Sequence, residues 1–171
     1  ATDITRPDYA DIGYAKGVPM GGDLTQAPEG KAPSLMVFAS KDPDGANLDR
    51  IQIIKGWLDV DGNSHEKIYD VALSPHRKVD PETGKAPAVG STVDVADASY
   101  TNTIGAVQLS AVWNDPDFDA STRAFYYVRV LEIPTPRWTA YDAKYFGIEM
   151  DAEIPMVQQD RAYTSPIWYT P

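Results

Sequence analysis

Apolar and polar residues alternate most regularly over residues 47–73, where the sequence is NLDRIQIIKGWLDVDGNSHEKIYDVAL. Side chains of a β-strand point alternately to its two faces, so this pattern predicts two strands. Asp61 and Gly62 lie between them, and both tolerate the positive φ angles that a two-residue type I′ turn needs. The first strand has apolar side chains on both faces. We therefore expect this hairpin in the middle of a sheet.

Shorter apolar runs predict further strands. Residues 34–40 (SLMVFAS) are bounded by turn residues, and residues 123–132 (RAFYYVRVLE) are rich in aromatic and β-branched side chains. Weaker patterns predict strands at residues 91–95, 100–105, 108–113 and 162–169, the last with a proline that favours an edge position or a bulge. Residues 139–146 predict one short helix, with Thr139 as its N-cap and Gly147 directly after it.

Glycine and proline are frequent in residues 1–31, and this spacing opposes regular structure. We therefore predict an irregular connecting segment over residues 1–31 and a β-domain over residues 32–171. Seven or eight strands with at most one short helix predict an all-β fold, an antiparallel two-sheet immunoglobulin-like sandwich with long loops. Because the chain has no cysteine, we expect apolar burial alone to hold the two sheets together.

The formal net charge of −10 argues against a nucleic-acid partner, because phosphate binding needs clustered lysine and arginine. No apolar run approaches the roughly 20 residues that span a bilayer, so we expect no membrane insertion. The lack of cysteine excludes disulfides, zinc–thiolate sites, iron–sulfur clusters and a cysteine nucleophile. The chain starts with Ala1 rather than Met, and we expect it to be a processed product or a fragment.

The chain has two histidines, His65 and His76, whereas a catalytic zinc site usually has three protein ligands. Their spacing matches no metal motif. We therefore expect no catalytic residue and no metal ligand in this chain. A small hydrolase that combines one histidine with carboxylates stays open as an alternative.

Two acidic loops are candidate calcium sites. Residues 59–63 (DVDGN) resemble the first half of a calcium loop, but Ser64 and Asp70 occupy the positions where such a loop needs glycine and glutamate. A hairpin turn explains this segment. Residues 42–47 (DPDGAN) could bind calcium through backbone carbonyls, or they could form a turn capped by their own aspartates. Both interpretations of the second loop stay open.

The segment 134–141 (PTPRWTAY) is the least explained by the fold alone. Arg137 can hold a carboxylate or a phosphate, and the flat rings of Trp138 and Tyr141 can stack on a sugar or another ring. Arg137, Trp138 and Tyr141 are therefore the candidate substrate-binding residues. The alternative is that the aromatic rings attach the short helix to the sandwich while Arg137 pairs with an acidic side chain.

Four segments carry a resemblance to a known family: GVPMGGDL at residues 17–24, GANLDRIQI at 45–53, EIPTPRW at 132–138 and AYTSPIW at 162–168. They resemble the C-terminal part of a bacterial, usually exported family catalogued as domain of unknown function number 3604. The N-terminal part of that family resembles the barrel of PHP-type (polymerase-and-histidinol-phosphatase) metal-dependent hydrolases. The resemblance covers nearly the whole chain, and the motifs have no known chemical role.

The resemblance implies a metal-dependent hydrolase, acting on ester or phosphoester bonds, that carries this chain as a β-sandwich tail in the periplasm or outside the cell. The divalent metal would belong to the barrel, because its His- and Asp-rich ligand motifs do not occur here. We therefore expect a non-catalytic sandwich whose partner is the N-terminal catalytic barrel and whose loop 134–141 shapes the substrate entrance. The alternative is a stand-alone module that binds sugars or small acids through Arg137, Trp138 and Tyr141.

Overall fold

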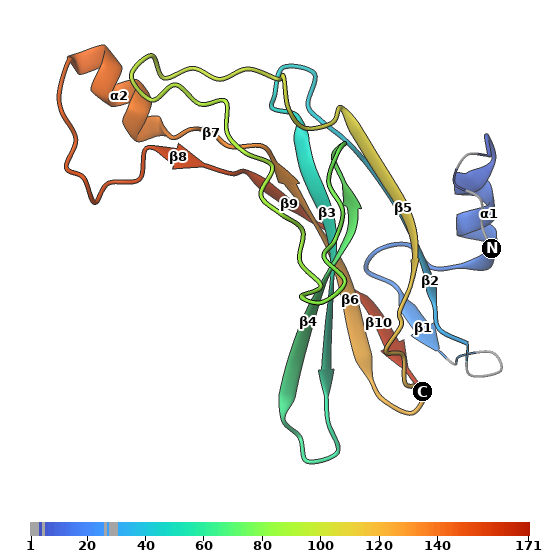
Figure 1. The fold of residues 1–171 in the computed structure, drawn as a ribbon. Coiled ribbons are helices and arrows are strands. Elements are labelled where there is room, and N and C mark those ends of the chain that lie inside the picture. Colours follow the sequence, from blue (N-terminus) through green and yellow to red (C-terminus); the bar gives the residue numbers. More distant parts are fainter. Residues whose placement is uncertain (1–3, 5, 26, 28–30) are drawn as a thin grey trace.

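The computed structural model describes residues 4, 6–25, 27 and 31–171, and most of them lie in β-strands or the loops between strands (Figure 1). The elements in chain order are α1 (Tyr9–Lys16), β1 (Asp23–Thr25), β2 (Ser34–Ser40), β3 (Leu48–Leu58), β4 (Ser64–Leu73), β5 (Gln108–Asn114), β6 (Ala124–Glu132), β7 (Thr135–Pro136), α2 (Trp138–Phe146), β8 (Val157–Gln158), β9 (Arg161–Tyr163) and β10 (Ile167–Thr170).

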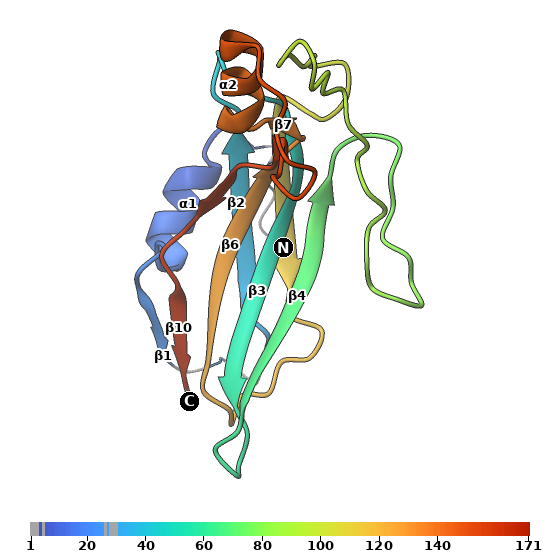
Figure 2. The same cartoon turned by 90° about the vertical axis from the view of Figure 1, so that its left-hand side faces the viewer.

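Most of the strands form a large and a small sheet that face each other, and β7 and β8 pair separately. The large sheet has the order β1-β10-β6-β3-β4, with β9 also paired to β6, and the small sheet joins β2 to β5. Figure 2 shows β3, β4 and β6 in front, with β2 and β5 behind them. The buried core between the sheets includes Leu35, Val37, Leu109, Ile51, Ile53, Tyr126, Val128 and Tyr169. The predicted all-β, two-sheet sandwich is confirmed, whereas its immunoglobulin-like character stays a prediction.

The predicted hairpin is central, as expected, because β3 pairs with β4 on one side and with β6 on the other. Its turn differs from the prediction. Gly62 has a φ of 83°, but Asp61 does not have a positive φ, so the turn is not type I′. The Gly62 N–H donates to the Asp59 carbonyl at 3.1 Å, and the Asp59 N–H donates to the Asn63 carbonyl at 3.0 Å. This is the longer hairpin loop in which a single left-handed glycine follows the turn.

The N-terminal segment contains regular structure where we predicted none. The helix α1 spans Tyr9–Lys16, and β1 pairs in parallel with β10 at the edge of the large sheet. The helix was missed because none of its residues is buried, so its sequence carries no apolar stripe. The described part of residues 1–31 thus adds a strand to the sandwich. Its role as a connection to another domain stays a prediction.

Two further strand predictions are wrong. Residues 91–95 and 100–105 are not strands; they belong to a long loop with isolated bridges at Asp94–Ser99 and Leu48–Ala106. The Thr92 hydroxyl donates to the Thr101 carbonyl and accepts from the Thr101 N–H, so side-chain bonds replace a strand ladder there. The last predicted strand is divided into β9 and β10, because the segment with the proline interrupts it.

A buried ion pair also joins the sheets, which corrects the expectation that apolar burial acts alone. The Lys55 Nζ of β3 lies 2.5 Å from the Asp115 Oδ2, which follows β5, and these side chains are 7% and 0% exposed. The Tyr126 hydroxyl of β6 donates to the same oxygen at 2.7 Å. Burial and the Asp115 carboxylate together raise the pKa of Tyr126. This cluster of Lys55, Asp115 and Tyr126 connects the two sheets, which have no disulfide between them.

Candidate functional site

The helix α2 lies at one end of the molecule, beyond the sandwich core (Figure 1). It begins at Trp138 with Arg137 as its N-cap, so Thr139 is inside the helix and not at its cap as predicted. The Thr139 hydroxyl instead donates to the Pro155 carbonyl at 2.6 Å. Gly147 ends the helix in the left-handed conformation, with a φ of 62°, as expected from its position.

Several contacts hold α2 against its surroundings. The Arg137 N–H donates to the Met156 carbonyl at 2.9 Å. Thr139 and Ala140, the buried residues of the helix, lie on its side toward the loop 148–156 and strand β7. The Lys144 Nζ lies 2.7 Å from the Asp97 Oδ1 in the long loop. That salt bridge lowers the pKa of Asp97. The helix is therefore fixed by two different loops, although it has only nine residues.

Large aromatic side chains of α2 point to solvent. Trp138 is 60% exposed, Tyr141 is 49% exposed and Tyr145 is 83% exposed. Their spacing of three and four residues places them on one face of the helix. The Phe146 ring packs edge-on against Tyr145, with centroids 4.9 Å apart. We call Trp138, Tyr141 and Tyr145 the α2 stripe; small residues, not these rings, attach the helix to the rest of the chain.

The predicted binding residues lie close together at the start of α2. The Arg137 Cζ lies 5.8 Å from the centre of the Trp138 ring, within the range of a cation–π contact. Tyr141 is on the same helix face, one turn further along. None of the three lines the cavity beside this helix.

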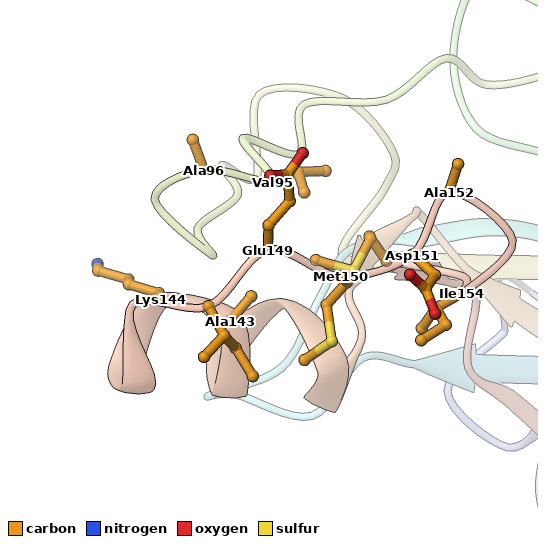
Figure 3. Close-up of a pocket in the computed structure, with 11 residues that line it drawn as sticks. Val95, Ala96, Ala143, Lys144, Glu149, Met150, Asp151, Ala152 and Ile154 are labelled. Atoms are coloured by element: carbon orange, nitrogen blue, oxygen red, sulfur yellow. The ribbon is translucent and has the colours of Figure 1, made fainter.

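That cavity, of about 390 Å³, lies between the C-terminal half of α2, residues 95–96 and the loop 148–156 (Figure 3). Its walls are mainly apolar, and Glu149 and Asp151 add carboxylates. The only lysine on its wall, Lys144, already pairs with Asp97. These charges oppose an anionic ligand. Sequence reasoning missed the cavity because residues 95–96, about 50 positions before the other lining residues, complete its wall.

The two histidines lie apart. His65 is next to the hairpin turn and His76 follows the other end of β4, a ten-residue strand about 30 Å long. The His65 ring stacks on Trp57, with centroids 5.3 Å apart, and its Nε2 lies 2.8 Å from the Asp59 Oδ2. The bond from His65, followed by those from Asn63, holds the pKa of Asp59 below its ordinary value. The two histidines therefore do not share a site, and a hydrolase that combines one of them with carboxylates stays a hypothesis.

The second acidic loop already holds a cation from its own chain. The Lys41 Nζ donates to the carbonyls of Asp42, Pro43 and Gly45, at 2.7, 2.9 and 2.9 Å. The Asp42 carboxylate accepts the Asp44 N–H at 2.9 Å, as in a self-capped turn. This arrangement favours the turn over the calcium site. Within residues 4, 6–25, 27 and 31–171, no three His, Asp or Glu side chains gather as a metal-binding group.

Comparison with known families assigns the whole chain. The family described as protein of unknown function, DUF3604, matches residues 1–171. The chain belongs to this family. No curated protein and no solved structure matches it. Of the helices in the described part of the chain, neither has the length and apolar character to cross a membrane.

Proposed function

We propose that this DUF3604 chain is a non-catalytic β-sandwich that packs on the PHP-like hydrolase barrel of a larger exported protein. The barrel would hold the divalent metal, because the described residues of this chain offer no set of ligands for it. The α2 stripe would form the contact, and Arg137 would lie at the edge of the substrate entrance. The protein would act in the periplasm or outside the cell.

The observation that carries this proposal is the exposure of the α2 stripe. Aromatic residues are enriched at protein interfaces, where they bury a large area at a small cost in conformational entropy. Here three of them share one face of a helix that two loops hold in place. A preformed surface of this kind loses little entropy when a partner covers it. The sandwich core itself does not use these rings.

A stand-alone module for sugars or small acids is the second candidate, supported by the contact between Arg137 and Trp138. It is weaker for two reasons. The candidate residues lie outside the cavity beside α2, whereas small-ligand sites are usually concave. The neighbouring cavity carries carboxylates that oppose an acidic ligand.

The experiment produces residues 1–171 and the barrel region of the same gene as separate polypeptides and measures their association by analytical ultracentrifugation. We expect a one-to-one complex. The double variant Trp138→Asp/Tyr145→Asp should weaken association at least tenfold, because it places charge in the interface. The matched control is Tyr14→Asp on α1, where the ring is 74% exposed and lies outside the proposed contact.

Three results would refute the proposal. The first is hydrolysis of ester or phosphoester substrates by residues 1–171 alone with added zinc or manganese. The second is the absence of a complex with the barrel. The third is equal loss of association in the Tyr14→Asp control. If Trp138→Ala instead abolished binding of a free sugar or carboxylate without affecting the complex, the second candidate would replace the first.

A further inference from the structure

A second set of aromatic rings lies on the outer face of the large sheet, away from the small sheet. It consists of Trp168 on β10, Phe125 and Tyr127 on β6, and Tyr163 on β9. Neighbouring ring centroids are 5.2 Å apart from Trp168 to Phe125, 6.3 Å from Phe125 to Tyr127, and 6.3 Å from Tyr127 to Tyr163. The four rings thus form one continuous series of neighbours, which we call the outer row.

Strand β3 leaves space for the two central rings of the outer row, Phe125 and Tyr127. Gly56 pairs with Phe125, and a Cβ at Gly56 would overlap the Phe125 ring. Ile54 pairs with Tyr127 and is completely buried, although it belongs to the outer face. The rings of Phe125 and Tyr127 are within 15° of parallel. The sequence of β3 therefore lets both rings lean over the sheet with a common orientation.

The ends of the outer row are open to solvent. Trp168 is 48% exposed and Tyr163 is 55% exposed. Figure 2 shows this face of β6 and β3 in front of the molecule, with the small sheet behind it. The α2 stripe lies beyond the far end of the sandwich, so the outer row is separate from the surface proposed above.

The outer row also has polar groups that are not used inside the chain. Among the described residues, the hydroxyls of Tyr127 and Tyr163 and the indole N–H of Trp168 have no hydrogen-bond partner. Arg129 continues the row along β6 and donates its Nε to Gln52 at 2.8 Å, and its Nη groups have no partner in the same part of the chain. Rings with free polar edges differ from a purely apolar interface. They suit a ligand with apolar faces and a hydroxylated rim.

We propose that the outer row binds a linear, neutral polysaccharide. The C–H face of a pyranose ring is apolar and packs on a flat aromatic ring, while its hydroxyls can bond to the tyrosines, Trp168 and Arg129. Four neighbouring rings offer stacking positions for more than one sugar unit, so the outer row fits a chain of sugars better than a single sugar. The net charge of −10 opposes an anionic polymer or an anionic lipid surface, and the four side chains of the outer row include no carboxylate to pair with a cationic polymer, so we take a neutral chain as the ligand.

The test uses residues 1–171 and isothermal titration calorimetry with four hexasaccharides. Cellohexaose, xylohexaose and mannohexaose have extended β-1,4 linkages, and maltohexaose has coiled α-1,4 linkages. We expect at least one extended hexasaccharide to bind, with maltohexaose at least tenfold weaker. Trp168→Ala and Tyr163→Ala should each weaken binding at least tenfold. The control Tyr14→Ala, a more exposed ring on α1, should bind like the parent chain.

Because the ligand is neutral, the affinity should also stay within twofold between 50 and 500 mM salt. Trp168 is part of β10, and if its variant failed to fold, Tyr163→Ala alone would decide the question. The proposal is overturned if none of the four hexasaccharides binds, or if Tyr163→Ala binds like the parent. It is also overturned if the Tyr163 variant loses only an association between protein chains, because the outer row would then be a protein interface. The α2 experiment can succeed or fail independently of these results.

Discussion

The guanidinium of Arg77 binds the carboxylate of Asp49, with the Nη2 2.5 Å from the Oδ1, and it connects the loop after β4 to the start of β3. Both side chains are buried, at 9% and 2% exposed. The same Nη2 donates to the Asp49 carbonyl and to the Ser74 hydroxyl, and the Nη1 donates to the Pro87 carbonyl. One arginine thus holds both ends of the loop 74–90 against the sheet.

Replacing this arginine should loosen the loop. We expect Arg77→Ala to lower the free energy of unfolding by roughly 2–4 kcal/mol, because it leaves the buried Asp49 with only its weaker partners Arg50 and Gln159. Urea denaturation measures this change. Thermolysin should also cleave the loop at Val79 faster. Lys78→Ala, an exposed neighbour in the same loop, should change neither quantity, and equal effects of both variants would contradict this role of Arg77.

The buried pair of Lys55 and Asp115 gives a second prediction. Lys55→Met keeps most of the side-chain volume but leaves a buried carboxylate without its cation, so we expect a loss of about 3–5 kcal/mol. Lys144→Met breaks the pair with Asp97, whose side chains are 51% and 63% exposed. It should lower the free energy of unfolding far less, because solvent screens an exposed pair. Similar losses in the two variants, measured by urea denaturation, would show that burial does not decide the strength of these pairs.

Gly56 should be intolerant of any side chain. Gly56→Ala would push the Phe125 ring away from β3, at a cost of about 1–3 kcal/mol in the free energy of unfolding. The matched control is Gly13→Ala in α1, where the added Cβ would meet only the Met36 Cε at 3.7 Å, an ordinary contact. That variant should gain up to about 1 kcal/mol from helix propensity. Thermal unfolding measures both, and a neutral Gly56→Ala would show that the ring can move freely.

Glu132 should make stability depend on pH. Burial, followed by the nearby Asp160, raises the pKa of Glu132 above its ordinary value of 4.5. The folded state therefore binds this proton more tightly than the unfolded state, so stability is lost as pH rises from 4.5 through the raised pKa. Glu132→Gln should unfold at a higher urea concentration than the parent at pH 7, and this difference should disappear below pH 4. A difference that is equal at pH 3 and pH 7 would point to packing rather than charge.

The sequence by itself determined the central hairpin and the strong strand β6. Their apolar and β-branched patterns are long enough that tertiary contacts could only reinforce them. It also located the end of α2, because Gly147 favours the left-handed conformation that stops a helix. The two-sheet class followed from the number and spacing of the strands. The candidate residues Arg137, Trp138 and Tyr141 were found as a group, although their common function stays a proposal.

Only the tertiary structure decided the features that join distant residues. The helix α1 has no buried face, so its sequence gave no periodic signal. Lys55 and Asp115 are 60 positions apart and could be recognised as partners only after β3 and β5 were packed. The outer row also depends on pairing, because β6, β9 and β10 bring its rings together. Local sequence preferences determine the helices and strands of this protein. Burial and strand register determine which side chains lie next to each other on each of its surfaces.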